Sequence, residues 1–249
     1  MKRFLGVDSK TPNDLVYGEL DRFPITINSG VKCIKYWLKL CCMPELRLPR
    51  KAYMMLHKLD ERGKRNWVSK VRMFLYEYGF GFVWANQGVG DVAGFVSVLK
   101  QRLIDCRWQD WTSHMSESER FFMYRGYGDL LHRRHLYILL DIDRHVKNSV
   151  VKFRFGVSNL RAHFYRYRPH RAADLLCPLC EESVEDEVHF VLSCPVLSNL
   201  RNKFIPEKFC KNPSLFRLNM LMASVNETTV KNLSIFLYKA FKLRDSLII

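Results

Sequence analysis

Apolar residues recur along most of this chain with the spacing of an α-helix. Between residues 31 and 41, lysines occur every three or four positions on one side, while Ile34, Trp37 and Leu38 face the other. Single-residue alternation of the kind that strands show is nearly absent. The predicted fold class is therefore mainly α, an irregular array of helices. Further helices are predicted over residues 50–62, 67–78, 92–106, 117–125, 128–141, 146–154 and 230–243.

Local signals mark where some of these helices begin and end. Asn66 and Asp91 precede apolar-periodic stretches and can cap the first turns, and Gly79 ends the helix that follows Asn66. The apolar positions that should face the core are Met54, Met55 and Leu59 in the helix over 50–62, and Val92, Phe95, Val98, Leu99, Leu103 and Cys106 in the helix after Asp91.

Composition supports a folded, strongly basic protein. Hydrophobic residues make up 48% of the 249 positions, enough for a core, and 40 Lys and Arg against 25 Asp and Glu give a net charge of +15. Such a charge favours a polyanionic partner, most commonly RNA or DNA, with an acidic protein or a membrane surface as the competing interpretation. The charge-free stretch from Tyr78 to Gly90 is shorter than the roughly 18 residues that span a membrane.

The start of the chain lacks the apolar run of a signal peptide, so we expect an intracellular protein, nuclear or cytoplasmic. Its eight cysteines are then expected to be reduced or metal-bound rather than paired in disulfides. We expect neither a membrane nor a small-molecule substrate as partner.

The basic residues concentrate in one segment. Residues 120–171 hold twelve Lys and Arg against three Asp, with aromatic residues interleaved. Phosphate-binding cations beside stacking aromatics are typical of proteins that bind RNA or single-stranded DNA. A solvated helical face is the simpler alternative. The candidate nucleic-acid-binding residues are Arg133, Arg134, Lys152, Arg154, Arg161, Arg166, Arg168 and Arg171, with Tyr165 and Tyr167 as stacking candidates.

The sharpest chemical signal is Cys177-x2-Cys180-x8-His189-x4-Cys194. Two cysteines separated by two residues can aim both thiolates at one centre, and a tetrahedral Zn²⁺ needs two further ligands of this kind. Three thiolates and an imidazole leave no open position, which predicts one structural zinc ion. The acids at 185–187 suit a helix N-terminus, and Pro195 should bring Cys194 back toward the other ligands. The alternative is a chance grouping in a cysteine-rich chain.

This segment closely resembles the cysteine–histidine region downstream of the polymerase in LINE-type, non-LTR retrotransposon reverse transcriptases of the jockey-like kind. The resemblance covers roughly residues 1–205. It implies a detached C-terminal piece of such a protein, a tail that handles template RNA and target DNA, and possible association with a reverse transcriptase. Besides the zinc segment, the matching stretches include Phe4-Leu-Gly-Val7, Val16-Tyr-Gly-Glu19, Ile34-Lys-Tyr-Trp37, Gln101-Arg-Leu-Ile-Asp105 and Phe153-Arg-Phe-Gly156.

The signatures of catalysis in that family are missing from this chain. No Tyr-x-Asp-Asp is present, and Asp141 and Asp143 are expected mid-helix on different faces. Pro206-Glu207-Lys208 does not continue into an acidic nuclease centre. We therefore expect no polymerase or nuclease activity. The alternatives to nucleic-acid binding are a zinc-stabilised scaffold that binds an acidic protein, or a relic reading frame without selected function.

Four regions are expected along the chain. Residues 1–112 form a helical region, 113–172 a basic helical region, 173–205 the zinc-binding module and 206–249 a C-terminal helical tail.

Overall fold

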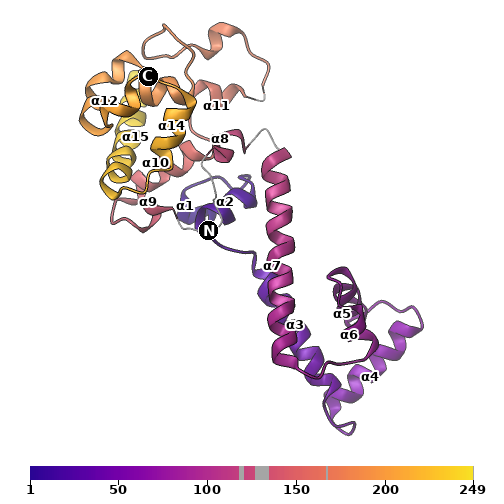
Figure 1. Cartoon of the computed structure of the whole chain (residues 1–249). Helices are drawn as coiled ribbons and strands as arrows, with labels where there is room; N and C mark the ends of the chain where they lie inside the picture. Colours follow the sequence, from indigo (N-terminus) through magenta and orange to yellow (C-terminus); the bar gives the residue numbers. More distant parts are fainter. Residues whose placement is uncertain (118–120, 127–134, 167, 249) are drawn as a thin grey trace. The chain divides into compact units, whose positions relative to one another are not determined.

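The computed structural model describes residues 1–117, 121–126, 135–166 and 168–248 (Figure 1). Within these residues the fold is mainly α, as predicted, and the β-type pairing is an isolated antiparallel bridge between Leu176 and Val184. The chain divides into two compact units. Unit 1 combines Met1–Arg22 with His114–Ile249, and unit 2 is Phe23–Ser113. Residues 1–22 therefore belong with the C-terminal part of the chain.

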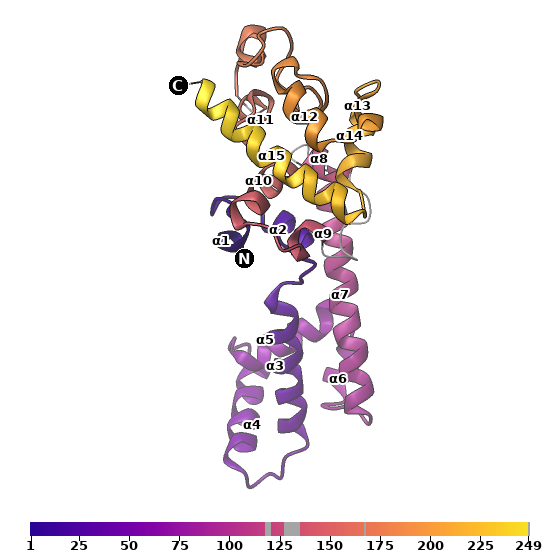
Figure 2. The same cartoon turned by 90° about the vertical axis from the view of Figure 1, so that its left-hand side faces the viewer.

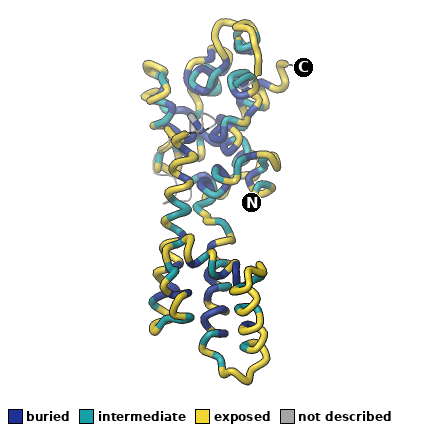
Figure 3. The backbone as a smooth tube through the Cα atoms, turned by 90° about the vertical axis from the view of Figure 1, so that its right-hand side faces the viewer, coloured by how far each residue is buried: buried dark blue, intermediate teal, exposed yellow. Residues whose placement is uncertain are grey.

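The helices of unit 2 are α3 (Ile25–Cys41), α4 (Leu48–Glu61), α5 (Trp67–Glu77), α6 (Gly81–Ala85) and the first part of α7 (Val92–Glu117). Their buried side chains form one apolar core, with Trp37, Val68, Leu75, Val83 and Leu99 inaccessible to solvent. Buried positions lie on the inner sides of these helices and exposed positions on the outer sides (Figure 3). None of the helices in the described part of the chain combines the length and apolar character that a bilayer span needs.

The predicted caps are confirmed. The side chain of Asn66 accepts a hydrogen bond from the Val68 amide at 2.7 Å, and that of Asp91 accepts one from the Gly94 amide at 2.9 Å. Gly79 follows α5 with a φ of 83°, a left-handed conformation that suits glycine.

The predicted inner face of α4 is wrong. Met54, Met55 and Leu59 are exposed, whereas Tyr53 is buried and Leu56 packs against the core. Helix α4 has apolar residues on two sides, and periodicity alone cannot choose between them. The face that contains Tyr53 is the buried one, and the Tyr53 hydroxyl accepts a hydrogen bond from the Trp37 indole at 3.1 Å.

A similar correction applies to α7. Phe95, Leu99 and Leu103 are buried as predicted, but Val98 is 58% exposed and Val92 lies near the surface. The predicted apolar residues spread around the circumference of α7, whereas the helix is buried along one stripe only. Those that lie off this stripe therefore face solvent.

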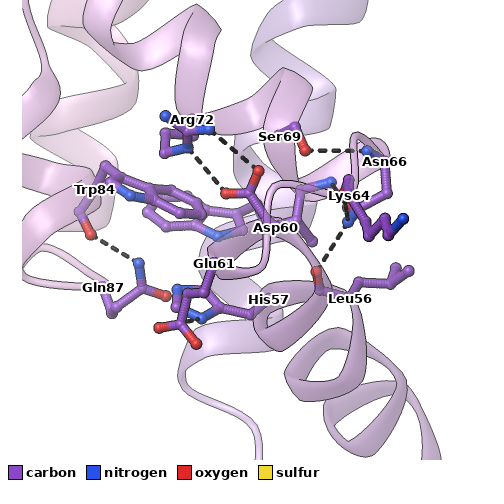
Figure 4. A network of polar contacts seen from close by, with 12 residues as sticks. Leu56, His57, Asp60, Glu61, Lys64, Asn66, Ser69, Arg72, Trp84 and Gln87 are labelled. Atoms are coloured by element: carbon purple, nitrogen blue, oxygen red, sulfur yellow. Dashed lines mark hydrogen bonds and ion pairs between the residues drawn. The ribbon is translucent and has the colours of Figure 1, made fainter.

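The turn between α4 and α5 is held by side chains (Figure 4). Arg72 of α5 donates two hydrogen bonds to the Asp60 carboxylate of α4, at 2.9 and 3.1 Å. The Asn66 amide donates to the Leu56 carbonyl at 2.9 Å, and the Asn66 backbone N–H donates to Ser69 at 3.0 Å. These contacts fix α4 against the rest of unit 2.

Unit 1 is built around its last helix. α15 (Glu227–Leu247) packs against α9 (Leu136–Leu139), α10 (Arg144–Arg154) and α12 (Ser198–Phe204), as Figure 2 shows. This confirms the helix predicted over 230–243, whose buried positions include Leu233, Phe236, Leu237 and Ala240. The described part of unit 1 also includes the α-helices α1 (Lys2–Leu5), α2 (Asn13–Leu20), α8 (Phe122–Arg125), α11 (Arg161–Tyr165), α13 (Glu207–Cys210) and α14 (Leu215–Met222).

Parts of two predicted helices, over 117–125 and 128–141, lie outside the described residues. Asp141, which lies between α9 and α10, is not mid-helix as predicted, and neither is Asp143. Asp143 precedes α10 and caps it, accepting a hydrogen bond from the His145 amide at 2.6 Å. A carboxylate used in this way satisfies an otherwise unpaired amide of the first turn.

Candidate metal centre and adjoining cavity

The first two cysteines of the motif lie on a tight hairpin. The Cys177 amide donates to the Ser183 carbonyl at 2.7 Å, and the Glu185 amide donates to the Leu175 carbonyl at 2.8 Å. Between these pairings the chain reverses, and Glu181 adopts a left-handed φ of 59° with its amide bonded to the Cys177 carbonyl. The reversal brings Cys180 back beside Cys177.

His189 and Cys194 are brought together by a π-helical turn over His189–Ser193. The Asp186 carboxylate accepts a hydrogen bond from the His189 amide at 2.7 Å, and the Cys194 amide donates to the His189 carbonyl at 2.7 Å. This i to i+5 closure places Cys194 under His189, which an α-helical turn of the same length would not do. Pro195 then begins a 3₁₀ turn.

The four side chains converge on one point. Their ligand atoms all lie within 4.8 Å of one another, with the Cys180 Sγ to His189 Nε2 distance at 3.4 Å and the Cys177 Sγ to Cys194 Sγ distance at 4.0 Å. In a tetrahedral zinc site with Zn–S bonds of about 2.3 Å, two sulfurs lie about 3.8 Å apart. Cys177 and Cys194 are fully buried. The cluster can hold a metal ion, and protein atoms supply all four ligands.

The two buried thiols of the cluster share a hydrogen bond. That contact, together with burial, raises the pKa of Cys177 to about 12. The same hydrogen bond lowers the pKa of Cys194, against the effect of burial. Cys194 is therefore the first of the pair to become the thiolate that metal binding requires.

Arg201 of α12, which was not among the predicted residues, supports this centre. Arg201 is buried, and its guanidinium donates to the carbonyls of Val191 at 2.9 Å and Cys194 at 2.5 Å. Buried carbonyls left by the end of the π-helical turn are thereby satisfied. In the sequence, the only sign of this role is a basic residue seven positions after Cys194. A solvent-exposed lysine or arginine would give the same pattern.

The three acids before His189 were predicted to suit one helix N-terminus, but each makes different contacts. Only Asp186 caps the turn. Glu185 is fully buried and accepts two hydrogen bonds from Arg244 of α15, at 2.5 and 2.8 Å, and one from the Arg161 amide at 2.8 Å. The Arg244 pair anchors the metal-binding hairpin to the last helix of the chain.

Glu187 connects the hairpin to α11 in the same unit. Its Oε1 lies 2.8 Å from His163 Nε2 and accepts a hydrogen bond from Arg166 at 2.7 Å. Burial opposes ionisation, but the His163 hydrogen bond and charge, with Arg166, hold the pKa of Glu187 at about 2. His163 in turn contacts the Ser158 hydroxyl at 2.7 Å through Nδ1.

Hydroxyl, imidazole and carboxylate in this order also occur in serine hydrolases. Here one carboxylate oxygen of Glu187 serves both His163 and Arg166, and the chain of groups joins two pieces of backbone. We interpret it as a structural link.

Ser158 and His163 of that link also line a cavity of about 940 Å³ within unit 1. Cations and aromatic rings share its wall, and Phe164 was not among the predicted residues. The Arg168 guanidinium lies 3.9 Å from the centre of the Phe164 ring, which is 51% exposed. The wall includes Lys10, Lys152, Arg166 and Arg168 with Phe121, Phe155 and Phe164, beside Ser158 and His163.

The structure brings only some predicted nucleic-acid-binding residues to this cavity. Lys152, Arg166 and Arg168 line it. Arg171 is exposed and pairs with Asp174, and Arg161 donates to the Asp174 carbonyl at 3.0 Å. Tyr165 is half-buried, with its ring 4.9 Å from that of Phe164. Arg133, Arg134 and Tyr167 lie outside the described residues.

Arg154 is placed where no phosphate can reach it. Its side chain is 2% exposed, and its Nε donates to the fully buried Glu19 carboxylate at 2.8 Å. His135 and Tyr137 complete this buried group, with His135 Nε2 3.0 Å from an Arg154 nitrogen and Tyr137 bonded to Glu19. Because Arg154 neutralises Glu19 in the core, we remove it from the candidate binding residues.

Comparison of the chain with protein-family models, curated proteins and solved structures finds no match. The class of protein is therefore defined by the fold and the site alone. It is a mainly α chain with a Cys₃His cluster that can hold a metal ion. The resemblance to retrotransposon proteins stays a prediction.

Proposed function

We propose that the Cys₃His cluster binds one structural Zn²⁺. Three thiolates and an imidazole are the donor set that zinc accepts in tetrahedral sites, and the spacing of the sulfurs suits its radius. In such a site the ion supplies folding free energy rather than catalysis, since no coordination position is left for a substrate. Cys177, Cys180, His189 and Cys194 would hold it.

We further propose that unit 1 binds single-stranded nucleic acid, RNA or DNA, along the wall of the cavity. The observation that supports this most strongly is the convergence of Lys152, Arg166 and Arg168 on one hollow beside the exposed Phe164 ring. Cations can neutralise backbone phosphates there while a ring stacks on a base. Such binding needs no catalytic group, and the chain would act as the non-catalytic tail of a reverse transcriptase of the kind it resembles.

The two proposals are connected through Glu187. This residue lies two positions before the ligand His189, and it holds the Arg166 side chain at the cavity. A folded metal module would therefore fix one of the cations that contact phosphate, and loss of zinc should weaken nucleic-acid binding as well as local structure.

The first test is metal analysis of the purified protein, followed by titration of labelled poly-U RNA and poly-dT DNA at several salt concentrations. If about six cations neutralise phosphates, log K should fall with log salt with a slope of roughly −4. Replacing Lys152 and Arg168 together by Ala should flatten the slope by about 1.4. The matched control replaces Lys208 and Lys231, which are exposed on other helices of unit 1, and should change the slope little.

Aromatic contacts are tested separately. Phe164→Ala or Tyr165→Ala should weaken binding by about 1–3 kcal/mol with an unchanged salt slope, if that ring stacks on a base. A wild-type slope near zero would exclude phosphate contacts and with them the nucleic-acid proposal, while leaving the zinc site in place.

A further inference from the structure

Helix α4 of unit 2 presents a second apolar face to solvent. Leu48 is 79% exposed, Met55 68% and Leu59 40%. The inner face of the same helix is formed by Tyr53 and Leu56, which pack into the core. At about 100° per residue, the exposed residues fall on one line along the outside of the helix.

The spacing on this line is that of a helix-packing seam. Leu48, Ala52, Met55 and Leu59 of α4, with Arg62 at its C-terminal cap, follow one another at intervals of four, three, four and three residues. This is the a/d pattern with which one helix inserts side chains between those of another. The name "α4 seam" is used here for these five residues.

Charged residues flank the seam on one side only. Lys51 and Lys58 are exposed and occupy the positions that precede Ala52 and Leu59, the g positions of the heptad. Charges at g choose the partner helix, because they pair with charges on its flank. Unit 2 has few acids of its own to meet them, with fifteen Lys and Arg against seven Asp and Glu in residues 23–113. Of those acids, Asp60 already pairs with Arg72 and Glu61 with His57.

We propose that the α4 seam binds an acidic amphipathic helix of a partner protein, with leucine-like side chains on the seam and carboxylates against Lys51 and Lys58. The proposal concerns unit 2 and does not depend on nucleic-acid binding by unit 1. The other side of the helix is already held in place by the Asp60–Arg72 pair (Figure 4) and by the hydrogen bond from Trp37 to Tyr53. Little ordering cost is then left for binding.

Charge argues against a second copy of this chain as the occupant. In an antiparallel pair, Lys51 and Lys58 would face the same lysines of the other copy, which is repulsive. In a parallel pair they would face the e positions, Pro49 and Leu56, which offer no carboxylate. Nucleic acid is disfavoured because the centre of the seam is apolar and offers no donor to a phosphate.

The test uses the full chain and two synthetic probe peptides of three heptads, both with Leu at a and d. One has Glu and the other Lys at e and g, and fluorescence anisotropy measures each. The wild type should bind the Glu peptide at least about tenfold more tightly than the Lys peptide. Met55→Glu should weaken binding of the Glu peptide at least about tenfold. Met73→Glu, a matched change at the exposed Met73 of α5, should leave it unchanged.

Charge reversal makes the assignment specific. Lys51→Glu with Lys58→Glu should lose the Glu peptide and gain the Lys peptide, since both residues are on the surface and their replacement spares the core. Equal binding of both peptides, absence of binding at 100 µM peptide, or equal effects of the Met55 and Met73 changes would overturn the proposal. Self-association abolished by Met55→Glu would assign the seam to a second copy. Competition of single-stranded RNA for the seam would assign it to nucleic acid.

Discussion

The two units of this chain bury different kinds of side chain. Unit 2 closes around apolar residues such as Trp37, Leu75 and Leu99, whose contribution depends mainly on the area removed from water. Unit 1 also buries an apolar set, but it encloses charged pairs, Glu19 with Arg154 and Glu185 with Arg244. A buried charge is tolerated only while its partner is in place. The stability of unit 2 should therefore change little with solution conditions. The stability of unit 1 should depend on bound metal, on its buried ion pairs and on pH.

Metal removal should separate the two units most strongly. Apparent binding free energies of structural zinc run to about 10–16 kcal/mol, so Cys194→Ser or a chelator should unfold the hairpin and the π-helical turn. Limited proteolysis with mass spectrometry should find new cleavage within 173–205 and continued protection of unit 2. Cys210→Ser, a half-buried cysteine outside the cluster, is the control and should retain the metal. Unchanged metal content in Cys194→Ser would disprove the ligand assignment.

Breaking one ion pair in each unit should sharpen the contrast. Arg244→Met strands the fully buried Glu185 carboxylate and should cost about 3–5 kcal/mol. Arg72→Met breaks the Asp60 pair, whose arginine is 42% exposed, and should cost about 1 kcal/mol or less. Hydrogen exchange of peptides from each unit measures both. Similar losses from the two variants would refute the difference in how the units are stabilised.

An apolar truncation should affect unit 2 alone. Leu75→Ala removes a fully buried side chain from its core and should cost about 2–5 kcal/mol. Met73→Ala, at an exposed position of the same helix, should cost about 0.5 kcal/mol or less. Tryptophan fluorescence during urea unfolding is selective, because all five tryptophans lie in unit 2. Loss of hydrogen-exchange protection in unit 1 upon Leu75→Ala would mean that the units unfold together.

Acid should weaken unit 1 through His135. Burial and the Arg154 charge lower the pKa of His135 to about 4, although Glu19 acts in the opposite direction. The unfolded chain binds a proton near pH 6.5 and the folded chain does not, so stability is full above pH 6.5 and falls as pH drops toward 4. The loss is about 2–3 kcal/mol over that window.

The pH effect is assigned by substitution. His135→Gln, which keeps an acceptor for Arg154, should remove this part of the pH dependence in hydrogen exchange of unit 1. His170→Gln, at an exposed histidine of the same unit, is the control. An unchanged pH profile in His135→Gln would rule out His135 as the source.

What the sequence predicts correctly is local. The four residues of the Cys₃His cluster span eighteen positions, and their spacing limits how the chain can turn, so the cluster is recognisable without the fold. Arg154 is different, because the residue that neutralises it, Glu19, lies 135 positions away. Counting charges over 120–171 does not reveal a buried ion-pair partner that lies outside this segment. Met55 shows a third case, since a helix with two apolar faces is predicted well as a helix and poorly as to which face is buried.

Unit 1 is made of two separate stretches of the chain, which the ribosome synthesises at different times. Residues 1–22 belong to unit 1, but all of unit 2 is made before the rest of that unit. Glu19 precedes Arg154 by 135 residues, so at about 5–20 residues per second it leaves the ribosome roughly 7–27 seconds earlier. Unit 2 can complete its core while the first segment still waits for its counter-charge. In a growing chain, the N-terminal helices thus wait for a long stretch of synthesis before their partners exist, and they are open to chaperones during that time.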